Sequence, residues 1–157
     1  MNYSKSLLLY QDEPEYGLLL KLIIMILPAG LLAASVYMWS SGDSSGGLAL
    51  LAEAFIVGLI FWAVLPRRYQ IYEDHLRIVL GGPFAVKTGF DRITTIEVTS
   101  RTALTVNFVT RFAKTYVRIG KKNGLSTAIT PKSNDMFVDN ANRASSQWAR
   151  TREVESQ

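Results

Sequence analysis

Two long apolar segments, separated by a short polar turn, constrain this chain more than any other feature of its sequence. Residues 18–39 contain one charge, Lys21, and residues 48–65 contain one charge, Glu53. At about 1.5 Å of rise per residue, about 20 helical residues cross a hydrocarbon core about 30 Å thick. We therefore expect a two-helix transmembrane hairpin over residues 17–65.

Two alternatives explain an isolated apolar segment. A buried helix of a soluble protein needs other protein around it, and a chain of 157 residues leaves too little to bury two such segments. A cleaved signal peptide begins with basic residues, whereas the first segment follows the acidic residues Asp12, Glu13 and Glu15. Its apolar part is also too long for a signal peptide, so the hairpin is the better explanation.

The charges that flank the segments predict their orientation. The turn over residues 40–47 contains no Lys or Arg, whereas Arg67 and Arg68 follow the second segment directly. Because positive residues accumulate on the cytoplasmic side, we expect a multi-pass protein of the inner cell membrane with both termini in the cytoplasm. Residues 1–16 then form a cytoplasmic N-terminal segment.

Charged residues within membrane segments are candidates for function. Lys21 lies three residues inside the inner end of its segment and Glu53 lies five residues inside the outer end, so the two do not pair. We expect each to extend its side chain to the nearer interface. Four residues are thus predicted as membrane-interface charges: Lys21, Glu53, Arg67 and Arg68.

The charge of the chain is unevenly distributed. Residues 1–65 contain two Lys and five Asp or Glu, a balance of −3, and residues 66–157 contain 15 Lys or Arg and eight Asp or Glu, a balance of +7. A basic domain beside a bilayer is attracted to anionic headgroups by about 1 kcal/mol for each cation that reaches the surface. Nucleic acid is the other usual partner of basic domains, but a membrane anchor argues against it. The absence of cysteine excludes disulfides and thiolate ligands.

After Arg68 the apolar pattern becomes short and alternating, which predicts about seven strands. Turn residues separate them, including Gly81-Gly82-Pro83 and Asn123-Gly124. The predicted strands are Tyr69–Tyr72, Leu76–Leu80, Ala85–Thr88, Ile93–Thr99, Leu104–Val109, Tyr116–Ile119 and Leu125–Ile129.

The last predicted element is an amphipathic helix of about four turns. Thr130 offers an N-cap with Pro131 at the first helical position, and an apolar stripe follows at helical spacing. We expect this stripe to cover the open end of a small barrel or bent sheet, and residues 151–157 to be a frayed tail. The stripe consists of Phe137, Ala141, Ala144 and Trp148.

Within the predicted cytoplasmic domain, residues 66–150, four stretches carry a resemblance: residues 69–78, Gly82-Pro83-Phe84, 90–97 and 129–132 with Phe137. Over roughly residues 66–145, and in the two-helix hairpin that precedes the domain, the chain resembles the bacterial PH-like (pleckstrin-homology-like) family of membrane-anchored proteins. The resemblance implies an α+β domain with an antiparallel barrel or bent sheet of about seven strands and a C-terminal helix. Photosystem assembly factors with two membrane helices share this layout, and no residue pattern chooses between the two.

Nothing in the sequence resembles an active site, and we expect no enzyme, cofactor or bound metal. His75 follows Glu73-Asp74 in what reads as an exposed hairpin turn. There is no nucleophile elbow and no phosphate-binding loop. A cap or a cross-strand ion pair with Arg92 or Arg101 would account for Asp91 and Glu97.

The densest basic stretch is the candidate contact for an anion or a partner. Its possible roles are binding of an anionic lipid headgroup, binding of a phosphorylated partner, or solvation alone. The stretch consists of Arg111, Lys114, Arg118, Lys121 and Lys122.

Two functions agree with these features. The first is a membrane-anchored interaction or assembly module, a scaffold that binds a partner protein through a sheet edge or a groove beside the C-terminal helix. The alternative is a sensor of anionic lipid surfaces that uses the basic stretch. Transport through Glu53 is a weaker third option, because two helices enclose no path without an oligomer.

Overall fold

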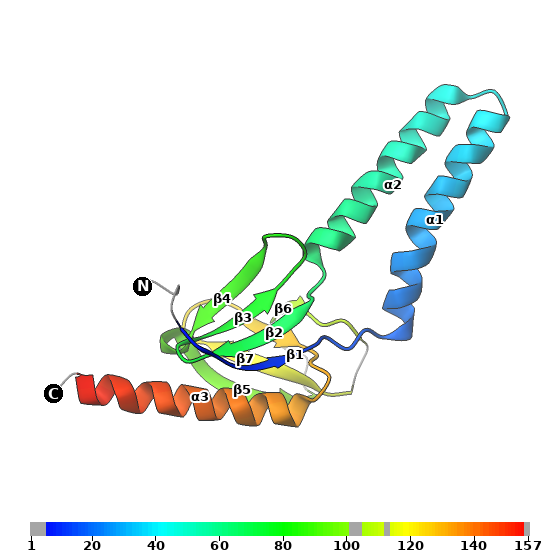
Figure 1. Ribbon diagram of the computed structural model, residues 1–157. Helices are drawn as coiled ribbons and strands as arrows, with labels where there is room; N and C mark the ends of the chain where they lie inside the picture. The colour runs from blue at the N-terminus through cyan, green and yellow to red at the C-terminus, as the bar shows by residue number, and fades with distance from the viewer. Residues whose placement is uncertain (1–5, 101–104, 112–113, 156–157) are drawn as a thin grey trace.

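Two long helices project side by side from a β-rich domain, and a third helix packs along that domain (Figure 1). The computed structural model describes residues 6–100, 105–111 and 114–155. A 3₁₀ turn, Phe90–Arg92, joins the fourth and fifth strands. The elements in chain order are β1 (Leu8–Asp12), α1 (Leu18–Ser40), α2 (Ser44–Val64), β2 (Arg68–Tyr72), β3 (His75–Val79), β4 (Ala85–Gly89), β5 (Ile93–Thr99), β6 (Thr105–Phe108), β7 (Tyr116–Lys121), β8 (Ser126–Ile129) and α3 (Asn134–Glu155).

The two predicted apolar helices are confirmed, and both are long and apolar enough to cross a membrane. Only 6% and 11% of their most apolar windows are buried, so they are not core helices of the domain. They pack against each other near the turn, where the buried Ser35 hydroxyl donates to the Gly47 carbonyl at 2.6 Å. The Asp43 carboxylate accepts from the Gly46 amide at 2.9 Å and caps the start of α2.

The strands form two four-stranded sheets, ordered β1-β2-β3-β4 and β5-β7-β8-β6. The seven expected strands are present, although Leu104 at the start of one lies outside the described residues. Of the two expected forms, a barrel or a bent sheet, the barrel is not found, because the described strands form two separate sheets. The expectation of antiparallel pairing throughout is wrong: β8 lies between β7 and β6 in the second sheet, and β6 pairs with it in parallel.

The eighth strand, β1, was not expected, and it changes the organisation of the chain. It precedes α1, yet it pairs antiparallel with β2, which follows α2, and Leu8 lies opposite Tyr72. The helical hairpin is therefore an insertion between the first two strands of the domain. Residues before the hairpin, expected to form a separate segment, complete the sheet (Figure 1).

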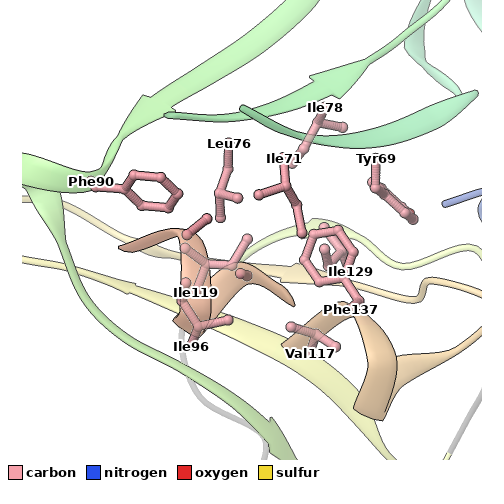
Figure 2. Packing of buried hydrophobic residues seen from close by; sticks show 12 residues of the cluster. Tyr69, Ile71, Leu76, Ile78, Phe90, Ile96, Val117, Ile119, Ile129 and Phe137 are labelled. Atoms are coloured by element: carbon pink, nitrogen blue, oxygen red, sulfur yellow. The ribbon is translucent and has the colours of Figure 1, made fainter. Parts of the chain in front are cut away.

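The core lies between the two sheets and α3 (Figure 2). Alternate residues of β2 and β3 point into it, because successive side chains of a strand lie on opposite faces. The expected stripe of α3 is confirmed: Phe137, Ala141 and Ala144 are buried and Trp148 packs against the cluster. The other buried members are Tyr69, Ile71, Leu76, Ile78, Phe90, Ile96, Val117, Ile119 and Ile129.

The start of α3 differs from the prediction. The helix begins at Asn134, and the Ser133 carbonyl accepts the Phe137 amide. The proposed cap, Thr130, is engaged elsewhere, because its hydroxyl accepts the Thr110 amide at 3.0 Å. At the other end the helix continues to Glu155, into the segment that we expected to be frayed.

Candidate functional site

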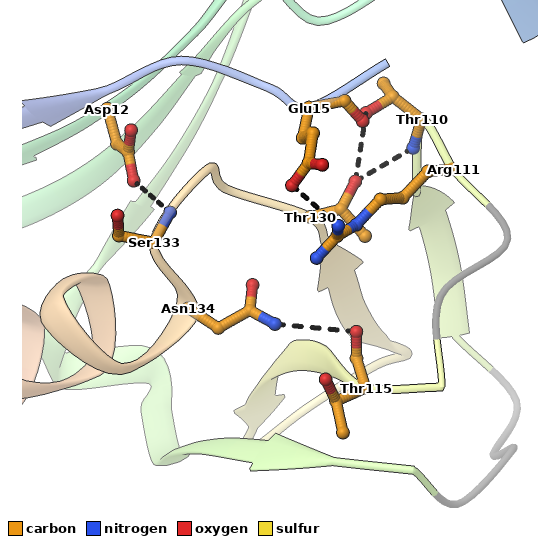
Figure 3. Close-up of polar contacts among 8 residues, drawn as sticks. All are labelled: Asp12, Glu15, Thr110, Arg111, Thr115, Thr130, Ser133 and Asn134. Carbon is orange, nitrogen blue, oxygen red and sulfur yellow. Dashed lines mark hydrogen bonds and ion pairs between the residues drawn. The ribbon is translucent and has the colours of Figure 1, made fainter. Parts of the chain in front are cut away.

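The segment before α1 is fastened to the domain by a buried threonine pair (Figure 3). The Thr110 hydroxyl donates to the Glu15 carbonyl at 2.7 Å and lies 2.9 Å from the Thr130 hydroxyl. The Gly17 amide donates to the Thr110 carbonyl at 2.9 Å, one residue before α1 begins. The Glu15 carboxylate also pairs with the Arg111 guanidinium at 2.6 Å. These contacts fix the point at which the chain enters the hairpin.

The other end of the hairpin is fastened as closely. The Arg67 amide donates to the Val79 carbonyl at 2.7 Å. The turn between β3 and β4 packs on the last turn of α2 (Figure 1), where a Cβ atom at Gly81 would lie 1.4 Å from the Trp62 carbonyl oxygen. Gly82, with φ of 61°, lies against the Trp62 ring. Glycine is required at this turn because no side chain fits between it and the helix.

Tyr16 joins the two ends of the hairpin. Its hydroxyl donates to the Pro66 carbonyl. Burial raises the pKa of Tyr16, and the positive charge of Arg67 partly opposes that rise. The phenol is therefore neutral at physiological pH and serves as a hydrogen-bond donor.

Two grooves meet at this junction. One, of about 640 Å³, runs between α1 and α2 and is lined by Tyr16, Lys21, Ile24, Met25, Pro28, Gly58, Phe61, Trp62, Leu65 and Arg67. The second, of about 450 Å³, lies on the outer face of the first sheet and is lined by Trp62, Arg67, Arg68, Gln70, Arg77, Val79, Leu80 and Gly82. The first is largely apolar and the second is basic. They share Trp62 and Arg67, whose guanidinium lies 5.7 Å from the Trp62 ring centroid.

Three of the four predicted interface charges gather here. Lys21 lines the apolar groove, Arg68 lines the basic one, and Arg67 lines both. Glu53 is exposed on α2 and lines neither groove. Since α2 begins at Ser44, Glu53 lies about 14 Å along the helix, nearer its middle than the apolar segment alone indicated.

The predicted basic stretch does not form one patch. Arg118 pairs with Glu97 across β5 and β7 at 3.8 Å, a partner that was not among those considered, whereas Asp91 lies 4.0 Å from Arg92, one of the expected partners. Arg101 lies outside the described residues. Lys114 is exposed before β7, and Lys121 and Lys122 lie at its far end. A six-residue strand is about 17 Å long, so the lysines are separated by the length of the strand.

Arg111, the first residue of that stretch, is held apart from the others by its ion pair with Glu15. Of the five predicted residues, only the three lysines therefore have no described carboxylate partner. The signal that sequence reasoning missed is Arg77. It occupies an outward position in the alternating strand His75–Val79 and faces the same groove as Arg68.

His75 is buried, and the expectation of an exposed turn histidine is wrong. Its ring stacks on Tyr72 with centroids 4.6 Å apart, and its Nδ1 lies 2.6 Å from the Asp74 carboxylate. This arrangement shields the ring at the end of the domain far from the hairpin. Within the described ranges, no group of three or more His, Asp or Glu residues is arranged to hold a metal ion.

Comparison of the chain with models of protein families, with curated proteins and with solved structures finds no match in any of the three. The geometry of the junction and of the domain surface is thus the basis for assigning a role.

Proposed function

We propose that this chain is a membrane-anchored, non-enzymatic interaction module, with α1 and α2 crossing the cell membrane and the β-rich domain at its cytoplasmic face. The observation that carries this proposal is the insertion of the hairpin between β1 and β2. Because the two strands pair, both ends of the hairpin lie on one side of any membrane that it enters. Arg67 and Arg68 beside the domain, and the absence of Lys and Arg from residues 40–47, favour the cytoplasmic side.

The rigid junction supports a role in presenting a surface. Backbone hydrogen bonds from Gly17 and Arg67, and the packing of Gly81 on α2, fasten both helices to the domain. A domain held in this way keeps one orientation relative to the bilayer. We further propose that the domain is PH-like, on the resemblance of its sequence and on its sheets with a C-terminal helix across them.

The proposed partner surface is a groove of about 580 Å³ between the free edge of β1 and α3, lined by Leu9, Glu73, Asp74, Gln147, Trp148, Arg150 and Thr151. The register of β1 and β2 shifts between Leu8 and Tyr10, which leaves Leu9 without a paired residue. Leu7 and Leu9 are 63% and 44% exposed, an apolar edge on which a partner segment gains contact area. Binding of a protein segment here is the interaction that we assign.

Photocrosslinking in native membranes tests this surface. A photoreactive phenylalanine in place of Gln147 should form an adduct with a partner protein, and Leu9→Glu in the same chain should abolish it. The matched controls are the photoreactive residue at Leu125, which is 52% exposed on the turn before β8, and Leu125→Glu. Absence of an adduct at Gln147, or equal adducts at both positions, would contradict the proposal.

Orientation is tested separately by labelling single cysteines, which the chain otherwise lacks. In intact cells Ser44→Cys should react with a membrane-impermeant maleimide, whereas Ala149→Cys should react only after the membrane is opened. Labelling of Ala149→Cys in intact cells would place the domain outside and overturn the proposed orientation.

A further inference from the structure

The strongest unexplained feature of the molecule is a cluster of arginines at the base of α2. Arg67, Arg68 and Arg77 line one groove on the outer face of the first sheet. The register explains their approach: Arg68 lies opposite Val79 and Gln70 lies opposite Arg77, so Arg68 and Arg77 are diagonal neighbours on the same face. The core residues Tyr69 and Ile78 alternate with them on the opposite face.

The positive charge of this cluster is not neutralised within the described part of the chain. The ion pairs found there involve His75, Arg92, Arg111 and Arg118, and none includes a member of the cluster. Three guanidinium groups along one groove therefore leave a positive charge there that a bound anion would offset.

Arg77 lines the groove and is partly buried, and its Nε has no hydrogen-bond partner among the described residues, as is also true of the Nε atoms of Arg111 and Arg118. A buried donor without an acceptor is unfavourable, and a phosphate oxygen is the acceptor that a guanidinium binds best, through two parallel hydrogen bonds. The groove thus presents the Arg77 guanidinium, and no carboxylate pairs with it within the described part of the chain.

The position of the groove identifies the kind of anion. It shares Trp62 and Arg67 with the apolar groove between α1 and α2, so the polar and apolar grooves adjoin at these two side chains. A ligand that fills both grooves has an anionic head and a hydrocarbon tail. A free phosphate would occupy the basic groove alone.

We propose that Arg67, Arg68 and Arg77 bind the phosphate of an anionic phospholipid, with one acyl chain lying in the groove between α1 and α2. This inference rests on the proposed function, which places the base of α2 at the membrane surface. It gives the domain a lipid contact distinct from the basic stretch that the sequence indicated.

Two substitutions separate the two halves of the site. Arg77→Gln removes the buried donor and its charge, whereas Gly58→Leu fills the apolar groove, because a Cβ atom at Gly58 meets no atom within 4 Å. Gly30→Leu is the matched control for the helix, since Gly30 is equally open and lines neither groove. Arg92→Gln is the control for charge, at an arginine whose side chain is 78% exposed.

The experiment uses the full chain in a non-ionic detergent, titrated with phosphatidylglycerol, phosphatidylcholine or inorganic phosphate. Native mass spectrometry measures the bound lipid, and the unfolding temperature gives an independent readout. Both lipids have a phosphate, but the choline cation of phosphatidylcholine is repelled by the three arginines, so we expect phosphatidylglycerol to bind at least about tenfold more tightly. Arg77→Gln should remove most of the preference for phosphatidylglycerol, and Gly58→Leu should remove most of the affinity for the lipid. The affinities of both control variants should remain within about twofold of that of the parent chain.

Each other result overturns the inference. Equal binding of the two lipids, or equal effects of Arg77→Gln and Arg92→Gln, excludes a specific headgroup site. Stabilisation by inorganic phosphate that matches phosphatidylglycerol and is insensitive to Gly58→Leu identifies a soluble anion instead. A chain that needs detergent for extraction but shows no lipid preference refutes this inference alone, whereas a chain that is soluble without detergent refutes the proposed function.

Discussion

Removal of the hairpin tests whether β1 is an essential part of the domain. We expect residues 66–157 alone to be unfolded, and residues 6–17 joined to 66–157 by a short glycine-serine linker to fold as a soluble unit. The ends to be joined lie together, because the Tyr16 hydroxyl donates to the Pro66 carbonyl. A short linker therefore closes the gap without strain and at a small cost in chain entropy.

The contacts of the N-terminal segment give the size of the effect. Tyr10 packs against the core with its ring centroid 6.3 Å from that of Phe137, a contact worth about 2 kcal/mol. Beyond the ladder with β2, the segment exchanges backbone hydrogen bonds with Thr130 and Lys132, each worth about 1 kcal/mol. The partly exposed pair of Glu15 and Arg111 adds little. The total is on the order of 5 kcal/mol, as large as the stability of many small domains.

Circular dichroism and heteronuclear NMR of the two proteins provide the assay. The joined protein should unfold in one cooperative transition and give dispersed amide resonances, and the 66–157 protein should do neither. Tyr10→Ala in the joined protein should lower the free energy of unfolding by about 2 kcal/mol, while Leu125→Ala, on an exposed turn, should change it by less than about 0.5 kcal/mol. If residues 66–157 alone unfold cooperatively at the temperature of the joined protein, β1 is dispensable and the reasoning is wrong.

Three further substitutions test local parts of the structure. Gly81→Ala should lower the stability of the full chain in detergent by about 2 kcal/mol or more, because its Cβ would clash with the Trp62 carbonyl, whereas Gly30→Ala in open space should have no such effect in the same thermal melt. Thr110→Val should cost about 2 kcal/mol in the joined protein, because the Glu15 carbonyl and the Thr130 hydroxyl lose a buried partner; an unchanged melting temperature would show that the threonine pair is dispensable. Burial raises the pKa of Asp74, but hydrogen bonds from His75 and Ser6 and the charge of His75 outweigh it, so that the folded pKa lies below the ordinary value of about 4. The ionised Asp74 carboxylate therefore stabilises the folded domain fully above the pKa of Asp74 in the unfolded chain, and this stabilisation is lost as the pH falls through its folded pKa. Asp74→Asn should cost about 1 kcal/mol at pH 7 and nothing once the wild-type carboxyl is protonated, and a cost that persists unchanged in acid would contradict this.

Elements with a strong local pattern were predictable from the sequence. The two apolar helices are defined by composition alone, and strands β2 to β8 by alternation between turn residues. The apolar stripe of α3 was equally clear, because Phe137, Ala141 and Ala144 repeat at helical spacing. The start of α3 was not, since Thr130 has the chemistry of a cap but forms a tertiary hydrogen bond with Thr110 instead.

Features that depend on distant contacts were not predictable. Strand β1 is five residues long, and its partner lies beyond the whole hairpin, so that Leu8 pairs with Tyr72. His75 follows two acidic residues, which suggested exposure, but the Tyr72 ring and the Asp74 carboxylate enclose it. The arginine groove depends on strand register and on the packing of a turn against α2, neither of which leaves a local signal.

Pairing of β1 with β2 also limits how the hairpin can relate to a membrane. A single spanning helix between paired strands would place β1 and β2 on opposite sides of the bilayer, where no backbone hydrogen bond between them can form. Any crossing by α1 must therefore be reversed by α2 before β2 begins. The same pairing argues against removal of α1 as a signal sequence, because cleavage after it would separate β1 from the sheet and expose the edge of β2. An insertion of two helices joined by a three-residue turn meets both requirements, because it returns the chain to the side on which β1 lies.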